Sequence, residues 1–195
     1  EVWPGTLGGV ETQMAFSPSA NLIVAPVYEL GSWYTGTSFD PNHPFDFTIA
    51  TGFIVALNPS DGSIVWQTPT ATGPLAALTI INDVILSGGL DGVVIAYNLA
   101  DGSELWKYQL PVGLNAPLAV SGDTVFVPAG GPLIPTAATN PTLPTGGTGL
   151  YALKLGGTVQ APWTAGEAAT PEATPVEGGG DAFAISTVDI AFQPN

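Results

Sequence analysis

The chain contains no cysteine and no arginine, and Lys107 and Lys154 are its only basic residues besides one histidine. The lack of cysteine excludes disulfides, thiolate metal sites and a cysteine nucleophile. With sixteen acidic residues the formal net charge is −14. This charge would repel nucleic-acid phosphates, and no basic footprint exists, so we expect no nucleic-acid partner. It also disfavours docking on anionic lipid.

Long apolar runs are missing as well. No stretch of 18 apolar residues occurs, so the sequence predicts no membrane span. No basic segment followed by an apolar one stands at the start, although a mature chain could have lost such a signal peptide. Little lysine with much threonine, proline and glycine favours an extracytoplasmic location: the periplasm, the cell surface or the secreted fraction. The acidic surface keeps the protein soluble, or offers a docking face to a basic partner such as a small electron carrier.

What the chain does have is apolar bulk and turn residues. Its 195 residues are 45% hydrophobic, enough for one domain or part of a larger one. The 25 glycines and 19 prolines favour short strands joined by many turns over long helices.

One segment occurs twice. The run from Gly52 to Trp66 recurs from Gly92 to Trp106 without a gap, at an offset of 106 − 66 = 40 residues. A fixed period of this size indicates a repeat architecture. The shared positions are Gly52 and Gly92, Ala56 and Ala96, Asp61 and Asp101, Gly62 and Gly102, and Trp66 and Trp106.

Each copy predicts two strands and a turn. In the first copy, residues 53–57 and 63–66 are apolar runs, and residues 58–62 between them are strong turn formers. After each tryptophan comes a polar stretch with proline (67–74 and 107–117). Strand pairs are then predicted at 75–81 with 84–87, and at 118–121 with 124–127. Four short strands in about 40 residues make one propeller blade, so the predicted fold is all-β.

Two partial copies extend the array. Residues 149–155, with Ala152, match part of the repeat, and Trp163 stands where its tryptophan would. Residues 14–17 and 22–26 predict another strand pair, followed by a long loop from Glu29 to Thr48. The total is about three to four blades. Because closed propellers typically need at least four, we expect this chain to be part of a larger propeller, of an eight-bladed type.

Composition divides the chain into three parts. Residues 1–164 form the propeller segment. Residues 165–181 are a linker rich in proline, threonine and glycine, which cannot offset ordering entropy by burial. Residues 182–195 predict a first strand of another domain that the chain does not contain.

The repeat, written Gly-x-x-x-Ala-Leu-Asn-x-x-Asp-Gly-x-x-x-Trp in its first copy, resembles that of propellers of the pyrroloquinoline quinone (PQQ) type. The resemblance implies that Trp66 and Trp106 pack between neighbouring blades, and that a parent protein could use PQQ with calcium. Residues 4–9 and 15–18 resemble a late blade of quinoprotein alcohol dehydrogenases, with Val10-Glu11-Thr12 where that family has an Asn-Trp. Glu11 and Glu29 lie near the family's cofactor-facing blade and are the candidate cofactor-binding acids. The family's catalytic aspartate and calcium ligands map onto no position here, so no catalytic residue is assigned.

The closing run 188–195 resembles the opening strand of a cupredoxin. That resemblance implies a copper site with two His, a Cys and a Met, whose ligands would lie beyond Asn195.

The one histidine lies in a polar loop. Asp40, Asn42, His43 and Asp46 could line a cation site, because oxygen ligands suit calcium; the alternative is a turn-rich loop without a metal. A Ser-His-Asp triad is not supported, since no nucleophile-elbow signal accompanies His43.

The Asp-Gly pairs at 61/62, 91/92 and 101/102 predict hairpin turns. At the rim of a blade we expect their carboxyl groups to keep ordinary pKa values, which disfavours acid–base chemistry.

Two functions follow from the sequence. The first is the C-terminal part of an extracytoplasmic, quinoprotein-dehydrogenase-like electron-transfer protein, with this chain supplying propeller scaffold next to a redox partner protein. The second is a non-catalytic propeller that serves as an interaction scaffold, as similar repeats do in outer-membrane assembly lipoproteins. In both, the remaining propeller blades are partners of this chain.

Overall fold

The computed structural model describes residues 2–36, 38–130, 133–134, 149–155 and 185–190. Nearly all of its regular structure is antiparallel β-strand, with one short 3₁₀ helix, η1 (Phe47–Ile49). No helix in these ranges has the length and apolar character needed to cross a membrane.

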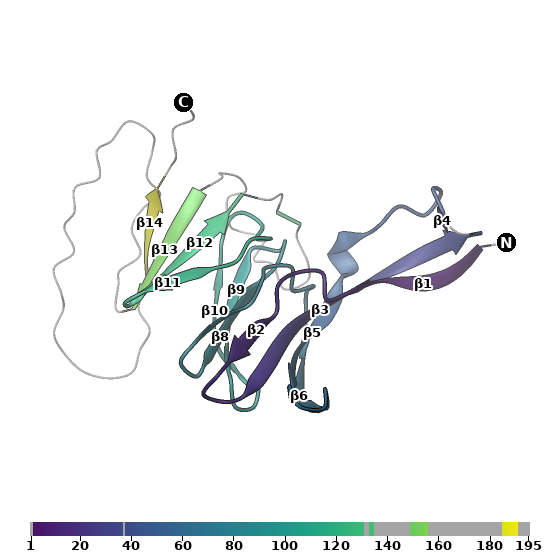
Figure 1. Cartoon of the computed structure of the whole chain (residues 1–195). Helices are drawn as coiled ribbons and strands as arrows, with labels where there is room; N and C mark the ends of the chain where they lie inside the picture. The colour runs from purple at the N-terminus through teal and green to yellow at the C-terminus, as the bar shows by residue number, and fades with distance from the viewer. Residues whose placement is uncertain (1, 37, 131–132, 135–148, 156–184, 191–195) are drawn as a thin grey trace.

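Three sheets follow one another along the chain (Figure 1). The first contains β1 (Val2–Gly9), β2 (Ala15–Ser17), β3 (Leu22–Thr35), β4 (Ser38–Phe39), β5 (Thr51–Leu57) and β6 (Ile64–Thr70). The second contains β7 (Thr79–Ile81), β8 (Val84–Gly88), β9 (Val93–Asn98) and β10 (Glu104–Gln109). The third contains β11 (Ala119–Ser121), β12 (Thr124–Ala129), β13 (Gly149–Leu155) and β14 (Ile185–Ile190).

Each sheet holds a four-stranded meander in chain order: β2-β3-β5-β6, β7-β8-β9-β10 and β11-β12-β13-β14. This is the propeller blade that the 40-residue repeat predicts, and the all-β fold class is confirmed. The outer strands run further than expected, because β6 continues to Thr70 and β10 to Gln109. The inner strand β7 begins at Thr79, four residues later than the strand that the sequence predicted from Leu75.

Strand β3 forms part of the first blade and part of a projecting arm. Its first half lies in the first blade, and its second half pairs with β1 in register from Gly9 opposite Tyr28 to Val2 opposite Thr35. With β4 at the tip, these strands form an arm that projects from the blades (Figure 1). The predicted loop from Glu29 to Thr48 is therefore wrong over its first seven residues. Burial alternates along the strand at Tyr28 (buried), Glu29 (exposed) and Leu30 (buried), because one face packs and the other meets solvent.

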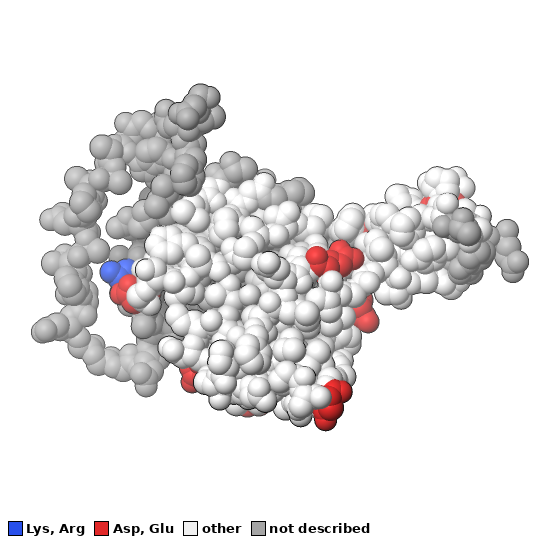
Figure 2. All heavy atoms as spheres, viewed as in Figure 1, with Lys and Arg blue, Asp and Glu red and all other residues white. Residues whose placement is uncertain are grey.

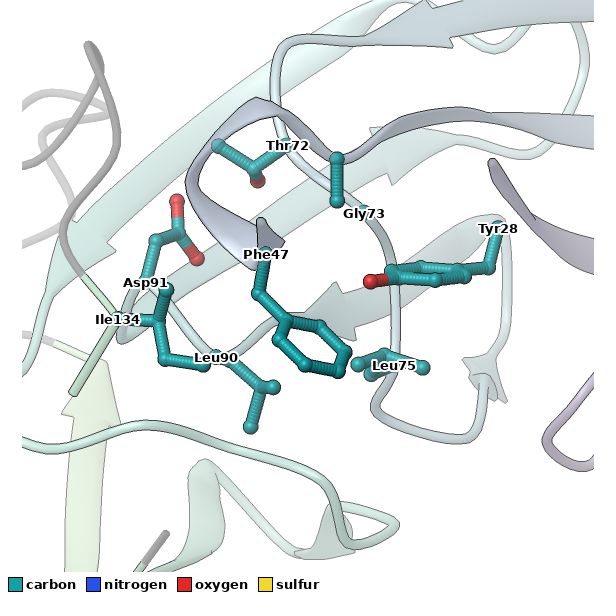
Figure 3. A pocket seen from close by; sticks show the side chains of 9 residues that line it. Tyr28, Phe47, Thr72, Gly73, Leu75, Leu90, Asp91 and Ile134 are labelled. Carbon is teal, nitrogen blue, oxygen red and sulfur yellow. The ribbon is translucent and has the colours of Figure 1, made fainter. Parts of the chain in front are cut away.

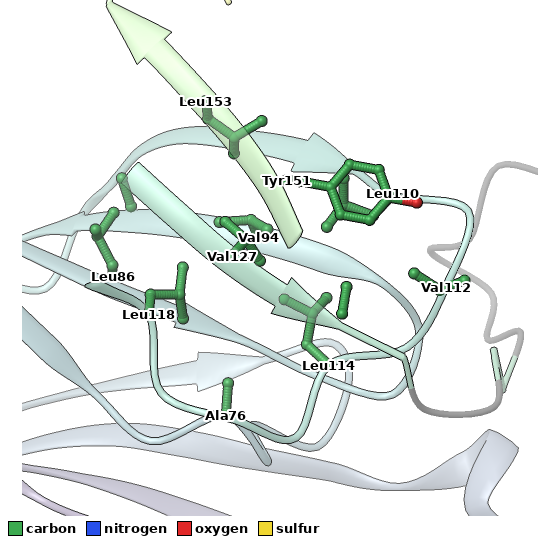
Figure 4. Packing of buried hydrophobic residues seen from close by; sticks show 12 residues of the cluster. Ala76, Leu86, Val94, Leu110, Val112, Leu114, Leu118, Val127, Tyr151 and Leu153 are labelled. Carbon is green, nitrogen blue, oxygen red and sulfur yellow. The ribbon is translucent and has the colours of Figure 1, made fainter. Parts of the chain in front are cut away.

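The core lies between the sheets. One buried cluster joins the first and second blades: Val24, Ile54, Ala56, Leu78, Ile85, Tyr97 and Leu99. A larger one joins the second and third blades (Figure 4), and its fully buried members include Val94, Leu110, Leu114 and Val127. The inward faces of neighbouring sheets thus interlock, as in stacked repeats.

Strand β14 pairs with β13, from Leu150 opposite Ile190 to Leu155 opposite Ile185. The sequence placed this run in a separate domain starting at residue 182, whereas here it is the fourth strand of the third sheet. The copper domain beyond it stays a prediction. The predicted linker at 165–181 and the repeat tryptophan at 163 lie outside the described residues.

The repeat turns are alike in both complete copies. Gly62 and Gly102 have φ of 73° and 72°, in the left-handed region that favours glycine. Asp61 and Asp101 each accept hydrogen bonds from the backbone and hydroxyl of the serine two residues on. These bonds hold the pKa of both carboxyl groups below the usual value. The expectation of ordinary pKa values in these turns is wrong.

Candidate functional site

A small hollow lies between the first two blades, and Figure 3 shows the side chains that line it. Tyr28, at the point where β3 leaves the blade for the arm, is one of them. The cavity volume of the hollow is about 10 Å³, which is room for one water molecule. The lining residues come from both blades and from the loops between them: Tyr28, Phe47, Ala50, Thr72, Gly73, Leu75, Leu90, Asp91 and Ile134.

Local structure places each of these side chains. Tyr28 lies on the buried face of β3 where the blade gives way to the arm, and Asp91 lies in the tight turn between β8 and β9. The loop from β6 to β7 brings Thr72, and Gly73 lies so close to the Tyr28 ring that a Cβ there would clash with it. Phe47 belongs to η1, whose first turn is capped by the Asp46 carboxylate.

Asp91 is only 2% exposed. Its Oδ1 accepts a hydrogen bond from the Val93 amide at 3.2 Å, and its Oδ2 makes none with any described residue. Burial raises the pKa of this carboxyl above the usual value, and the Val93 amide and the nearby Thr72 hydroxyl offset part of the rise. The sequence expectation of a rim carboxylate with an ordinary pKa is therefore wrong here, because the neighbouring blade covers this turn.

Tyr28 is the second buried polar group of the hollow. It is 3% exposed, and its Oη makes no hydrogen bond with any described residue. Burial raises the pKa of the phenol, and the negative charge of Glu11 adds to the rise. Figure 3 shows the Tyr28 hydroxyl and the Asp91 carboxylate turned towards the same space. Buried polar atoms without partners are uncommon, which singles this place out.

The two acids proposed for a cofactor do not line this hollow. Glu29 is exposed on the opposite face of β3 from Tyr28. Glu11 is exposed between β1 and β2 and reaches the hollow only through its charge on Tyr28. The structure thus does not bring Glu11 and Glu29 together at one site.

In the polar loop proposed as a cation site, the carboxylates of Asp40 and Asp46 accept hydrogen bonds from residues of the same loop. Asp40 is buried and accepts bonds from the Asn42 amide and side chain, both at 3.1 Å, and from His43 Nδ1. These bonds hold its pKa below the usual value, with the Asn42 amide as the largest cause. Asp46 is turned instead to Thr48. Among the described residues no three His, Cys, Asp or Glu side chains gather as metal ligands would.

The hollow does not fit the cofactors that the resemblance implies. PQQ is a polyanion and needs cationic partners, but the hollow presents a carboxylate. The ammonium groups of Lys107 and Lys154 lie elsewhere, 3.0 Å from Glu104 and 3.7 Å from Asp123. Calcium takes six to eight oxygen ligands, more than Asp91 and two hydroxyls supply. Copper needs nitrogen and sulfur donors, and none lines the hollow.

The blade interface supplies the other notable arrangement. Trp66, on the outer strand of the first blade, donates a 3.0 Å hydrogen bond from Nε1 to the Leu99 carbonyl of the second blade. Its ring lies against Gly102, and Thr68 donates to the Gly102 carbonyl at 2.8 Å. Trp106, the matching residue one blade on, packs against the cluster between the second and third blades.

A PQQ-repeat family described as outer membrane protein assembly factor BamB matches residues 50–187. The chain belongs to this family. The match extends from the start of β5 into β14, so it includes the strand that completes the third blade. No curated protein matches the chain.

Two solved quinoprotein-type structures, with TM-scores of 0.60 and 0.50, agree on the propeller fold. A quinohemoprotein alcohol dehydrogenase from Comamonas testosteroni is similar over 88% of this chain and 30% of its own, with a TM-score of 0.60 and 18% identity. A europium-containing methanol dehydrogenase is similar over 62% of this chain and 24% of its own, at 0.50 and 18%. BamB from Moraxella catarrhalis is similar over 79% and 48%, at 0.39 and 19%. The chain spans less than half the length of each.

The sequence did not predict that Tyr28 and Asp91 line the same hollow. One signal was available: the residue matching Asp91 in the first copy is Thr51, so the repeat does not itself require an acid there. Phe47 and Ile134, which line the same hollow as Asp91, are more than 40 residues away from it in sequence. No local pattern reports such a contact.

Proposed function

We propose that this chain is a non-catalytic propeller scaffold that acts by packing against further protein segments, the first of them another blade of the same repeat. The observation that carries the proposal is an open blade surface around Gly62. In the second blade the matching surface, around Gly102, is covered by Trp66.

The two surfaces have the same geometry. In each turn the asparagine amide donates to the serine carbonyl (2.9 Å at Asn58, 2.8 Å at Asn98), and the glycine amide donates to the asparagine carbonyl at 2.8 Å. A Cβ built on Gly102 would meet Trp66 and Thr68, whereas one built on Gly62 meets nothing within 4 Å. Because the two turns have the same geometry, the difference lies in what packs against them: Trp66 and Thr68 cover Gly102, and no described residue covers Gly62.

The repeat fixes what would cover Gly62. By the 40-residue offset, the carbonyl of Pro59 takes the place of that of Leu99. The expected occupant is therefore an outer strand with a tryptophan whose Nε1 donates to Pro59, and a hydroxyl side chain two residues later that donates to Gly62. Continuity of one interface from blade to blade is the usual construction of stacked repeats.

The test compares glycine-to-alanine variants in the purified chain and in the native assembly isolated from its source cells. In the purified chain, we expect Gly62→Ala to destabilise no more than Gly122→Ala, since both glycines have positive φ and open space around them. In the assembly, Gly62→Ala should become as damaging as Gly102→Ala, measured by pulse proteolysis in urea. If Gly62→Ala still matches Gly122→Ala in the assembly, nothing packs there and the scaffold proposal fails.

A second candidate is the electron-transfer role, favoured by the similarity to quinohemoprotein alcohol dehydrogenase over 88% of the chain. Because the hollow does not fit PQQ, residues other than those that line it would have to hold quinone and calcium. A bound-quinone absorption band after incubation of the native protein with both would support this role, and its absence would reject it. An extracytoplasmic location belongs to both candidates, and cell fractionation tests it.

A further inference from the structure

The projecting arm carries four aromatic side chains in single file, called here the aromatic row. Tyr34 lies on β3 and Phe39 directly opposite it on β4, while Phe45 lies in the loop after β4 and Phe47 in η1. Along the row the centroids of neighbouring rings are 5.1, 4.8 and 6.3 Å apart. Phe47 also lies beside the hollow that Tyr28 lines, so the row runs from the tip of the arm to its base.

The aromatic row is fixed in position and open to solvent. Tyr34 donates a 3.1 Å hydrogen bond from Oη to the Thr6 carbonyl of β1, and a Cβ on Gly5 would clash with its ring, so the ring lies across β1. The three phenylalanines are between 36% and 42% exposed. Contiguous exposed rings, unlike single scattered apolar side chains, mark interaction sites. A two-stranded ribbon is marginally stable by itself in water, so a partner on the row would also stabilise the arm.

Charge restricts which partner can cover the row. Asp46, between the last two rings, is exposed, and Figure 2 shows little other charge on the arm in this view. The two lysines of the chain pair with acids of the second and third sheets. A net charge of −14 repels a second copy of the chain, a nucleic acid and an anionic membrane. The partner is therefore an apolar segment that is neutral or basic.

The single-file arrangement suits an extended chain. In the polyproline II (PPII) conformation each turn has three residues and rises about 9 Å, so a Pro-x-x-Pro run presents two proline rings at that spacing. Alternate rings of the row are separated by two centroid steps of 4.8 to 6.3 Å, which accommodates the same spacing. Proline-rich segments are recognised by surfaces lined with aromatic side chains, and their preformed conformation lowers the entropy cost of binding.

We propose that the aromatic row binds a proline-rich segment of another protein, extended in the PPII conformation. Two prolines of the segment lie over the rings, and a lysine or arginine next to them pairs with Asp46. The pairing selects for orientation more than for affinity, because exposed ion pairs contribute little free energy.

This inference goes beyond the proposed scaffold role and does not depend on the blade contact at Gly62. Strand β5 begins at Thr51, which pairs with Glu29 at the base of the arm, and Gly62 follows the other end of the strand. The two surfaces are therefore separate, and either proposal can fail without the other.

The experiment titrates the purified chain with three peptides and follows backbone amides by NMR. The first is acetyl-Pro-Thr-Leu-Pro-Thr-Lys amide; the second has alanine for both prolines, and the third has glutamine for lysine. We expect the first peptide to shift the amides of Phe39, Phe45 and Thr48, and the second to leave them unmoved. The third should bind about threefold more weakly than the first. If the first two peptides shift these amides equally, or neither does, the proposal is rejected.

Matched variants locate the binding surface. Phe45→Leu keeps apolar bulk but removes a ring, so we expect the first peptide to bind about fivefold more weakly. Phe39→Leu makes the same change one ring along and should act alike. Phe16→Leu is the control, because Phe16 is 53% exposed on β2 and lies outside the arm. Equal weakening in the control, or unchanged binding in both arm variants, would overturn the site.

A further variant tests the charge. Asp46→Asn keeps an oxygen for the Thr48 amide that caps η1. We expect it to weaken the lysine peptide about threefold and to leave the glutamine peptide unchanged. Equal weakening of both peptides would reject the contact with Asp46.

The chain has the Pro-x-x-Pro spacing in its own sequence, at residues 132–135 and 141–144. A variant with alanine at Pro141 and Pro144, measured without added peptide, should leave the amides of Phe39 and Phe45 unmoved. A shift of these amides would mean that the chain's own segment occupies the row, which would overturn the proposal of a separate partner.

Discussion

The indole ring of Trp66 lies directly against the backbone of Gly102, and the two residues come from neighbouring blades. This contact leaves no room for a side chain at residue 102. It joins the outer strand of the first blade to the β9–β10 turn of the second, and Trp66 also packs against the buried cluster between these blades. At this point the blade interface requires a large side chain at residue 66 and none at residue 102.

Replacing Gly102 by alanine should destabilise the chain more than any other turn glycine tested. The new Cβ would clash with the Thr68 hydroxyl and lie 2.5 Å from Trp66 Cε3, at a φ of 72°. We expect a cost of about 1–2 kcal/mol for the backbone conformation and about 1–3 kcal/mol for overpacking. Urea unfolding measures it, and Gly122→Ala supplies the backbone cost alone. Equal costs for the two variants would contradict the contact.

Replacing Trp66 by phenylalanine should cost about 1–3 kcal/mol, because the Leu99 carbonyl would lose its indole donor. Trp33→Phe is the matched control, since Trp33 is 41% exposed on the arm and should change stability by less than about 0.5 kcal/mol. Thermal unfolding of both variants gives the comparison. A similar loss in both would show that aromatic size alone matters.

The variant Asp91→Asn should be more stable than the parent chain at neutral pH. Burial raises the folded-state pKa of Asp91 above 3.8. Between pH 3.8 and that raised value the folded state binds more protons than the unfolded one, so stability falls as pH rises. Asparagine does not titrate, and the advantage of the variant should therefore shrink as pH falls towards 3.8. Unfolding curves at several pH values test this, and an advantage that grows at low pH would be the wrong sign.

Removing the serine hydroxyl beside a turn aspartate should raise the pKa of that aspartate towards its usual value. Asp101 owes its low pKa first to the Ser103 hydroxyl and then to the Ser103 amide. Ser103→Ala removes only the first of these, so part of the lowering should remain. NMR titration of the Asp101 carboxyl checks the shift, with Asp61 in the other turn as an unaffected internal control.

Local sequence predicted the blades well because a blade is built from local contacts. Residues 53–57 and 93–98 are apolar and β-branched, and Asn58 and Asn98 open turns that close by hydrogen bonds within five residues. The arm was missed over Glu29–Thr35 because its partner, β1, precedes it by more than 20 residues and was judged only as part of a blade.

The candidate site could not be predicted in the same way. Asp61, Asp91 and Asp101 all precede a glycine, yet two are exposed with lowered pKa values and one is buried with a raised pKa. The sequence distinguishes them in one respect: a serine follows Asp61 and Asp101 two residues on, whereas Val93 follows Asp91. It does not report that Asp91 is buried. Burial of the carboxyl group itself decides the sign of the pKa shift, since desolvation disfavours the charged carboxylate and local amide and hydroxyl donors favour it. Asp101 stays exposed although its neighbour Gly102 is covered by Trp66, whereas Asp91 is buried.

By itself the sequence determined the repeat period, the four-stranded blade and the conformation of its turns, because these depend on residues close together in the chain. Only the tertiary structure decided that Gly102 is covered while Gly62 is open, and that Tyr28 and Asp91 share a hollow. Those outcomes depend on which surfaces meet, and burial acts on a side chain through neighbours that its own segment does not contain.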